Sequence, residues 1–386
     1  MTEKELSKIY PSSLIDAQHA LNTLIFNSDY NIAAIPTDSD SLPPLRFTQD
    51  LRLDTLHQHF FAPILHLTNR GGKCWRSFLG LVCIAALGVD PEPFKPFLAA
   101  IEVIHAGELV IDDIEDESPM RRGVPSVHTL WGIPTAINAG TASYFSFDTA
   151  MRSMSESLPP HTTVLLYQTF FETMRAGHVG QCLDIAGQQQ SDLDDILAGR
   201  IHPSILEKRI ISAHRLKTAM VAANIAKMSA TIAEASPSQT RALSIHFERV
   251  GIAFQIMDDV RDIRGSSNGG SYIINDQNMT NNKPVLKRRG DDIRCGKFNI
   301  PIAKAGSMMP LNEAQWLWET VMRKTGNDDV TTQQVIDKLE AYGIVDICVE
   351  EAQKMVNDSW ANLEGHLKDS PAKILLRALG WYLVKL

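Results

Sequence analysis

Two clusters of aspartate residues have the spacing and the chemistry of metal-ligand sites. They are Asp112-Asp113-Ile114-Glu115-Asp116 and Asp258-Asp259-Val260-Arg261-Asp262. Each cluster follows an apolar segment with helical spacing, so its first and last aspartates lie one turn apart and project from one face. Carboxylates stacked in this way repel one another until a hard cation binds them, and Mg²⁺ prefers such oxygen ligands. The sequence therefore predicts two helices whose aspartates hold Mg²⁺ ions, which could in turn bind a polyanion such as diphosphate.

The ordinary alternative is that both clusters are solvated helix ends, because acidic runs are common on protein surfaces. Two copies of the same spacing, each after an apolar helix, argue against this alternative. The first copy also runs directly into the basic sequence Arg121-Arg122-Gly123. Metal binding is therefore the interpretation that the sequence favours.

The composition indicates a protein with a sizeable core and without a nucleic-acid-binding surface. The chain has 386 residues, of which 44% are hydrophobic, and a formal net charge of −8, which does not suit a polyanionic partner. The five cysteines are odd in number and scattered, a pattern that fits reduced thiols better than disulfides or a zinc site. The longest apolar run, residues 75–89, falls short of the roughly 20 residues that span a bilayer. We expect no transmembrane segment, no secretory signal and a cytoplasmic location.

The apolar residues from position 51 onward recur mostly at spacings of three and four, which is typical of helices. Turn signals such as Gly71-Gly72 and Pro159-Pro160 separate these segments, and strand-like alternation is scarce. The sequence contains no internal repeat of the length that solenoid proteins have, so we do not expect a solenoid. The pattern predicts one all-α domain over residues 46–386, with helices packed around a central cavity. Residues 1–45 are expected to form a loosely ordered extension.

One segment interrupts the helical pattern directly after the second aspartate cluster. Residues 266–282 are rich in Gly, Ser and Asn. A loop of this length beside a functional site is either a lid or a disordered insertion. We favour a mobile lid.

An ordered set of short motifs resembles the polyprenyl synthetase family, whose members are trans-isoprenyl diphosphate synthases. Besides the two aspartate clusters, the set comprises Gly71-Gly72-Lys73-x-x-Arg76, His105, Arg121-Arg122-Gly123-x-Pro125, Gly180-Gln181, Lys217-Thr218, Phe254-Gln255 and Gly296-Lys297-x-x-x-Pro301. The run from Asp112 to Pro125 is most similar to geranylgeranyl diphosphate synthases. The resemblance implies the all-α isoprenoid synthase fold and a homodimer.

The resemblance also implies the reaction, which joins an allylic diphosphate to isopentenyl diphosphate. Breaking the allylic C–O bond places charge on the leaving diphosphate, and preorganised cations lower that barrier. The resemblance assigns all six aspartates as metal ligands for about three Mg²⁺ ions. It assigns further positive charge around the allylic diphosphate to Arg121, Lys217, Lys287 and Lys297.

A second diphosphate would occupy a metal-free cationic pocket. By resemblance, this pocket consists of Lys73, Arg76, His105 and Arg122. Arginine suits the role because its planar fork binds phosphate oxygens in a bidentate manner. The released diphosphate would then accept the proton that leaves the condensed cation, in a region lined by Lys217, Thr218 and Gln255.

Product length in this family depends on the residues below the first aspartates. The positions four, five and eight before Asp112 are Glu108, Gly107 and Ile104, and we expect them to face the cavity. Gly107 offers no bulky side chain to stop growth, which favours geranylgeranyl diphosphate or a longer product. Glu108 departs from the usual small or apolar residue, and a carboxylate in an apolar tunnel requires a metal or a basic partner.

Two other functions stay open at this point. A terpene cyclase on the same scaffold would ionise a prenyl diphosphate without using isopentenyl diphosphate, and it would not need Lys73, Arg76, His105 or Arg122. A non-catalytic partner subunit would tend to lose an aspartate cluster. Since this chain carries both clusters and all four basic residues, the sequence favours the synthase.

Overall fold

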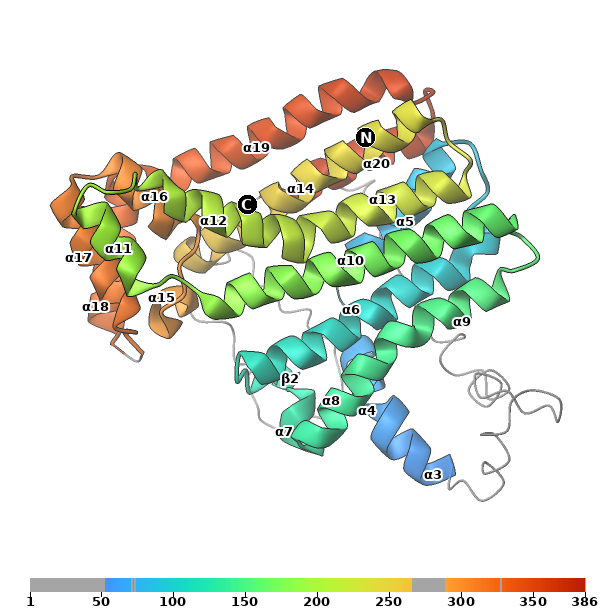
Figure 1. The fold of residues 1–386 in the computed structure, drawn as a ribbon, viewed down its shortest axis with the longest axis horizontal. Helices are drawn as coiled ribbons and strands as arrows, with labels where there is room; N and C mark the ends of the chain where they lie inside the picture. Colours follow the sequence, from blue (N-terminus) through green and yellow to red (C-terminus); the bar gives the residue numbers. More distant parts are fainter. Residues whose placement is uncertain (1–52, 71, 73, 266–288, 327, 386) are drawn as a thin grey trace. The chain divides into compact units, whose positions relative to one another are not determined.

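The protein is described by a computed structural model that covers residues 53–70, 72, 74–265, 289–326 and 328–385. Within these ranges the regular structure consists of helices and one pair of two-residue strands (Figure 1). The prediction of an all-α fold is confirmed. The predicted extension over residues 1–45, the lid over residues 266–282, and the site residues Lys73 and Lys287 lie outside the described residues.

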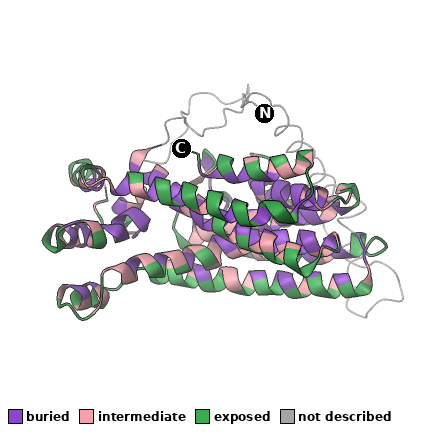
Figure 2. Cartoon of the chain, turned by 90° about the horizontal axis from the view of Figure 1, so that it is seen from above, coloured by how far each residue is buried: buried purple, intermediate pink, exposed green. Residues whose placement is uncertain are grey.

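Burial along the helices follows the period that the sequence predicts. In Figure 2 buried residues form stripes along the helices and exposed residues occupy the opposite sides. This is the pattern of amphipathic helices that bury one face against their neighbours.

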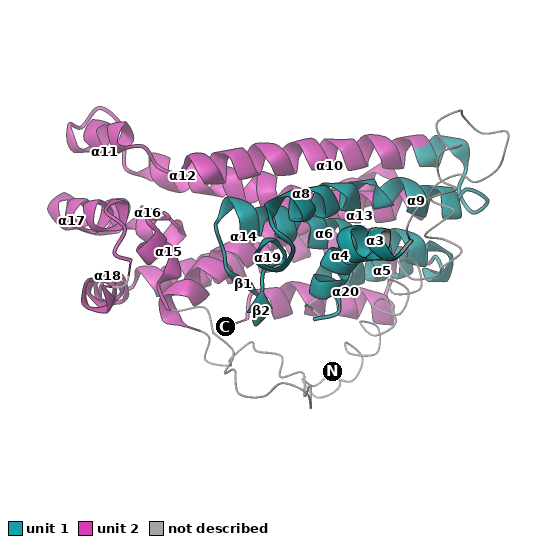
Figure 3. Ribbon diagram, turned by 90° about the horizontal axis from the view of Figure 1, so that it is seen from below, with its two compact units in different colours: residues 1–85, 89–163, 271–285 teal, residues 86–88, 164–270, 286–386 magenta. Residues whose placement is uncertain are grey.

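The described residues divide into two compact units (Figure 3). Unit 1 contains residues 53–85 and 89–163, and it includes the first aspartate cluster. Unit 2 contains residues 86–88, 164–265 and 289–385, and it includes the second cluster. Each unit is therefore described by itself.

Unit 1 is built around the long helix α6. Its elements are α3 (Leu53–Leu56), η2 (His57–Phe61), α4 (Ala62–Thr68), α5 (Trp75–Ala86), η3 (Glu92–Phe94), α6 (Lys95–Glu115), β1 (Met120–Arg121), β2 (Val124–Pro125), α7 (Val127–Trp131), α8 (Ile133–Ala142), η4 (Ser143–Phe145), α9 (Ser146–Ser153) and the first turn of α10 (Pro160–Ala186). Helix α6 packs against α4, α7, α8 and α9. Ala106 and Val110 of α6 share a buried cluster with Leu67 of α4 and Ala136 of α8. This packing fixes the axis along which the first aspartates project.

Unit 2 is built around helix α14. Besides the rest of α10, its elements are α11 (Gln190–Leu197), α12 (Ser204–His214), η5 (Arg215–Ala219), α13 (Met220–Ile232), α14 (Pro237–Arg264), α15 (Asp291–Cys295), α16 (Ile300–Met308), α17 (Leu311–Met322), α18 (Asp329–Ala341), α19 (Ile344–Leu363), η6 (Glu364–His366) and α20 (Pro371–Leu383). Helix α14 begins with a reciprocal capping box between Ser236 and Gln239. It then packs against α13, α19 and α20, and these contacts hold its C-terminal aspartates in place.

The helices that the structure describes are too short or too polar to span a membrane. This agrees with the expectation from the sequence.

Candidate active site

The first aspartate cluster lies at the C-terminal end of α6. Asp112 is half-buried, Asp113 is buried and Asp116 is exposed. Asp116 forms the C-cap, and its backbone N–H donates to the carbonyl of Asp112 at 2.9 Å. Acidic side chains are unfavourable here because the C-terminal end of a helix carries partial negative charge. The cluster therefore needs positive charge from elsewhere.

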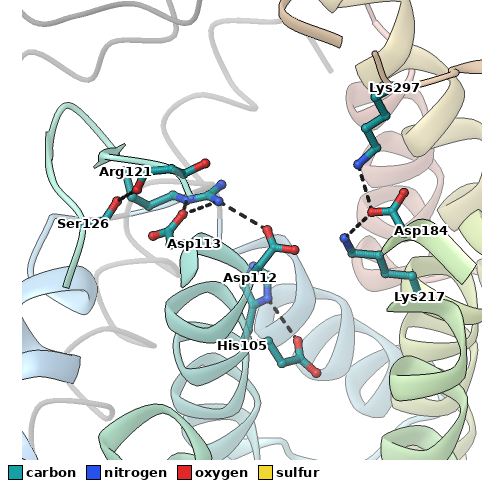
Figure 4. Close-up of polar contacts among 10 residues, drawn as sticks. His105, Asp112, Asp113, Arg121, Ser126, Asp184, Lys217 and Lys297 are labelled. Carbon is teal, nitrogen blue, oxygen red and sulfur yellow. Dashed lines mark hydrogen bonds and ion pairs between the residues drawn. The ribbon is translucent and has the colours of Figure 1, made fainter. Parts of the chain in front are cut away.

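Arg121 supplies part of that charge (Figure 4). Its Nε donates to Oδ1 of Asp113 at 2.6 Å, and its Nη2 donates to Oδ2 of Asp112 at 3.3 Å. Burial raises the pKa of Asp113, and the guanidinium of Arg121 opposes this change. One arginine thus already faces the carboxylates that the sequence assigns to the allylic diphosphate site.

The two consecutive arginines of this segment point to different places. Strands β1 and β2 pair in an antiparallel hairpin whose connection is Arg122-Gly123, with φ angles of 52° and 77°. Positive φ at both central residues is the requirement of a type I′ turn. Arg121 lies on a strand and contacts the aspartates, whereas Nη1 of Arg122 donates to the carbonyl of Leu67 at 3.0 Å. The hairpin therefore distributes the two cations over two neighbouring sites.

The second of these sites contains Arg76, His105 and Arg122. Nη1 of Arg76 lies 3.1 Å from Nε2 of His105. A Cβ added to Gly72 would lie 2.8 Å from Nη2 of Arg122, so the glycine lets this guanidinium approach the backbone. The Nε of Arg76 is buried and has no hydrogen-bond partner among the described residues. Burial lowers the pKa of Arg76, and the charge of Arg122 lowers it further. Three of the four predicted pocket residues therefore lie near one another in unit 1.

The second aspartate cluster lies at the end of α14 in a different setting. Asp258 is exposed, whereas Asp259 and Asp262 are buried. Ile300 is the first residue of α16. Its N–H donates a hydrogen bond to Oδ2 of Asp259 at 3.0 Å. Oδ2 of Asp262 accepts from the N–H of Asp292 at 3.2 Å. Two of the three predicted metal ligands are thus also used to hold the segment that follows.

One residue of unit 2 that contacts two predicted site residues was not predicted from the sequence. Oδ2 of Asp184 accepts hydrogen bonds from Nζ of Lys217 at 2.8 Å and from Nζ of Lys297 at 2.9 Å (Figure 4). Burial raises the pKa of Asp184, but the two ammonium groups outweigh it and lower the pKa to about 2. The signal was present in the sequence, since Asp184 lies three residues after Gln181 on one helix. Asp184 holds together two cations that were predicted separately.

Lys217 and Thr218 lie in the π-helical turn η5 between α12 and α13. A Cβ on Gly180 of α10 would lie 2.3 Å from the N atom of Lys217, and one on Gly251 of α14 would lie 2.5 Å from Cα of Ala219. These two glycines allow the neighbouring helices to pack directly on the turn. The hydroxyl of Thr218 donates to Oε1 of Gln255 at 3.2 Å. The structure therefore brings the predicted Lys217, Thr218 and Gln255 together, and π-helical turns often occur at functional sites.

His214 of α12 lies beside the second cluster. Its Nε2 is 3.8 Å from Oδ2 of Asp259. Burial lowers its pKa to about 3. Because 3.8 Å is too long for a hydrogen bond, the contact supports no role for His214 beyond packing.

The three residues expected at the cavity floor have different surroundings in the structure. Ile104 is buried. Gly107 faces α8, because an added Cβ would lie 2.5 Å from the carbonyl oxygen of Gly140 and 2.7 Å from Cβ of Ser143. Glu108 lies beside a basic partner, with Oε2 3.4 Å from Nδ1 of His105. The packing of Gly107 conflicts with the expectation that its side-chain direction is open to a growing chain, since a helix–helix contact occupies that direction.

The donor chemistry of the six predicted aspartates fits Mg²⁺, which takes carboxylate oxygens. Within the described part of the chain, no group of three or more His, Cys, Asp or Glu side chains is already arranged around one metal position. Asp113 and Asp259 are held by hydrogen bonds to Arg121 and to the N–H of Ile300. These contacts would have to change or be shared for the residues to act as ligands.

The chain is similar in sequence to known proteins. A family model described as polyprenyl synthetase matches residues 57–339. A geranylgeranyl pyrophosphate synthase of Geoglobus acetivorans is 31% identical over 83% of this chain and 88% of its own length. A short chain isoprenyl diphosphate synthase of Methanothermobacter thermautotrophicus is 27% identical with the same coverage.

Similar solved structures carry the same fold. A geranylgeranyl pyrophosphate synthetase from Pyrococcus horikoshii aligns with a TM-score of 0.73 and 24% identity over 99% of both chains. The Geoglobus acetivorans structure aligns with a TM-score of 0.70 and 26% identity over 97% of this chain and 99% of that one. The expectation of the isoprenoid synthase fold is confirmed.

Proposed function

This chain belongs to the polyprenyl synthetase family and is a trans-prenyltransferase, and from this premise we propose that it condenses an allylic diphosphate with isopentenyl diphosphate. The observation that carries the proposal is the hairpin of unit 1. It directs Arg121 to the aspartates and Arg122 to Leu67 and Gly72, where its charge acts on Arg76. A condensing enzyme needs two diphosphate sites side by side, whereas a cyclase needs one. Two separate cationic sites on one hairpin therefore support the synthase.

The allylic diphosphate would bind to metal ions at the two aspartate clusters. The proposed ligands are Asp112, Asp113, Asp116, Asp258, Asp259 and Asp262. When bound, about three Mg²⁺ ions supply positive charge that stabilises the leaving diphosphate. Arg121 adds a fixed cation in unit 1, and Asp184 holds the ammonium groups of Lys217 and Lys297 in unit 2. Cations that are already in position require little rearrangement when the C–O bond breaks.

Isopentenyl diphosphate would occupy the pocket of Arg76, His105 and Arg122, with Lys73 as a fourth member. The unpartnered Nε of Arg76 and the planar guanidinium groups suit a phosphate ligand. After condensation the released diphosphate would accept the proton, while Lys217, Thr218 and Gln255 orient it. No dedicated carboxylate or histidine base is then required.

We propose geranylgeranyl diphosphate as the main product. The support is the name of the Geoglobus acetivorans relative. A relative from Geobacillus stearothermophilus named as a farnesyl diphosphate synthase is 33% identical, but over only 55% of this chain. Product length is thus the part of the proposal that measurement must decide.

We also propose a homodimer, because one helix of unit 2 exposes an unusual number of apolar side chains. They are Val164, Leu165, Phe171, Val179, Leu183 and Ile185 of α10, each between 44% and 60% exposed. Exposed apolar side chains grouped on one element are typical of an interaction surface, and a second copy of the chain is the occupant that we propose. Molar mass from light scattering would test it. The cytoplasmic location stays a prediction.

Product analysis tests the proposed reaction. The purified protein would be incubated with Mg²⁺ and each of dimethylallyl, geranyl, farnesyl and geranylgeranyl diphosphate, with and without isopentenyl diphosphate. We expect longer linear diphosphates only when isopentenyl diphosphate is present, with growth ending at geranylgeranyl diphosphate. Hydrocarbons or alcohols formed without isopentenyl diphosphate would identify a cyclase instead. No turnover in any mixture would favour a partner subunit.

A further inference from the structure

We infer that Glu108 is a positioning residue for the isopentenyl diphosphate pocket, where it orients His105 and, through His105, the guanidinium of Arg76. This inference rests on the proposed function, because it assigns a role within the pocket for the second substrate. It explains an acidic residue at a position where a small or apolar one was expected. It also gives Glu108 a role other than setting the length of the product.

The three residues form a continuous chain of contacts in unit 1. Oε2 of Glu108 lies 3.4 Å from Nδ1 of His105, three residues earlier on the same face of α6. On the other side of the ring, Nε2 of His105 lies 3.1 Å from Nη1 of Arg76 on α5. The side chains of His105 and Glu108 are 19% and 34% exposed. The imidazole therefore separates a carboxylate from a guanidinium.

Donor and acceptor rules determine the tautomer of His105. Arginine can only donate, so Nε2 of His105 must accept the hydrogen bond from Arg76. A neutral imidazole with a bare Nε2 carries its proton on Nδ1, which then donates to the carboxylate of Glu108. Burial and the charge of Arg76 both lower the pKa of His105, which favours this neutral form. Glu108 is thus the acceptor that stabilises the tautomer on which the contact to Arg76 depends.

The charge of Glu108 also acts on Arg76 directly. Burial lowers the pKa of Arg76, and Glu108 is the largest opposing influence, ahead of Glu102. Glu102 is already engaged, because its Oε1 accepts a hydrogen bond from the N–H of Ser77 at 3.0 Å. Glu108 therefore stabilises a guanidinium that must stay charged beside a second one, Arg122, before a diphosphate arrives.

Substitutions at position 108 separate the two features of the carboxylate. Glu108→Gln keeps an oxygen that can accept from Nδ1 but removes the charge, whereas Glu108→Leu removes both. We expect Glu108→Leu to raise the KM for isopentenyl diphosphate about tenfold, with a smaller rise for Glu108→Gln. The KM for the allylic substrate and kcat should change by less than about twofold. The chain length of the product should stay the same. Glu108→Asp should restore part of the affinity, and Glu156→Leu, an exposed acidic position of the same unit, is the matched control.

A second measurement does not depend on turnover. The ¹⁵N shifts of the His105 ring, assigned by comparison with His105→Gln, should show a proton on Nδ1 in the natural protein and a mixture of tautomers in Glu108→Leu. A proton on Nε2 in the natural protein would overturn the inference. So would an unchanged KM for isopentenyl diphosphate, or a changed product length with that KM unaltered. If the natural protein makes no product, the proposed function fails, and the ring shifts still decide the role of Glu108.

Discussion

The two aspartate clusters share one spacing but have different surroundings. In unit 1 the aspartates end α6 and contact the side chain of Arg121, which is carried by a separate hairpin. In unit 2 the buried aspartates accept hydrogen bonds from the backbone N–H groups of Ile300 and Asp292. The first cluster is thus partly neutralised by one side chain, whereas the second is part of the framework of its unit. The same motif therefore predicts that the carboxylates share one side of a helix, but it does not predict which groups they contact.

This difference predicts which aspartates can be replaced without harm to folding. Asp112 is half-buried and Asp258 is exposed, so neither side chain is part of a core. Asp259 is buried against the start of α16, so its loss would affect both structure and chemistry. We therefore expect Asp112 and Asp258 variants to affect catalysis alone, and Asp259 variants to affect both catalysis and stability.

The largest expected effect is on turnover. Asp112→Ala and Asp258→Ala should each lower kcat by at least about 10²-fold, because each removes a ligand for the cations that stabilise the leaving diphosphate. Steady-state rates with a saturating concentration of Mg²⁺ would measure the loss. Thermal unfolding of the same variants should stay close to that of the natural protein. Full activity in both variants would refute the assignment of the aspartates as metal ligands.

The next largest effect is on the KM values of the two substrates, and it differs between the two arginines of the hairpin. Arg121→Gln should raise the KM for the allylic diphosphate by roughly 10-fold, and Arg122→Gln should raise the KM for isopentenyl diphosphate by a similar factor. Each loss follows from removing one charged hydrogen-bond donor from one site. Initial rates with each substrate varied in turn would measure both constants. Equal effects of both variants on both substrates would contradict the division of the hairpin between two sites.

The sequence predicted those parts of the site that depend on positions along one helix. The spacing of Asp112 to Asp116 and of Asp258 to Asp262, together with their apolar flanks, predicted two helices that end in carboxylates. The grouping of Arg76 with His105, which lie on two different helices, came from the family resemblance and not from spacing. A spacing of three or four residues places side chains on one face of any helix, so it can be predicted from the sequence alone.

The parts that were missed depend on contacts between elements. Asp184 joins Lys217 and Lys297, which are 80 residues apart in the sequence, and no spacing rule connects them. Gly107 was expected to leave room for a growing chain, but a glycine also permits two helices to touch, and here it packs on Gly140. The sequence shows that a side chain is missing at position 107. It does not show whether a cavity or another helix fills the space.

A smaller effect concerns the stability of unit 2. Asp259→Ala should lower the free energy of unfolding by about 1–3 kcal/mol, because the buried N–H of Ile300 loses its acceptor. Asp258→Ala, the exposed neighbour, should change it by less than about 0.5 kcal/mol. Urea unfolding at neutral pH would measure the pair. Equal stabilities would show that the second cluster is no more part of the framework than the first.

The smallest expected effect is a dependence of stability on pH, which arises from His246 on the helix that also bears the second cluster. His246 of α14 is buried, and its Nδ1 lies 2.8 Å from Oγ of Ser359. That hydroxyl already donates to the carbonyl of Val356 at 3.0 Å, so Nδ1 must carry the donated proton. The other ring nitrogen, Nε2, has no partner among the described residues. A second proton there would be buried without an acceptor, and burial accordingly lowers the pKa of His246 to about 3.

The sign of the effect follows from the two states. Unfolded histidine has a pKa of about 6.5, so between pH 6.5 and about 3 the unfolded chain binds a proton at His246 that the folded chain does not. Stability from this group is therefore complete well above pH 6.5 and falls as the pH decreases, by about 1.4 kcal/mol at pH 5.5. His246→Asn keeps a donor for Ser359 but cannot titrate, so its urea midpoint should fall less steeply between pH 7 and pH 5 than that of the natural protein. His178→Asn, at an exposed position of α10, should leave the slope unchanged, and equal slopes for all three proteins would show that protonation at Nε2 is tolerated in the folded unit.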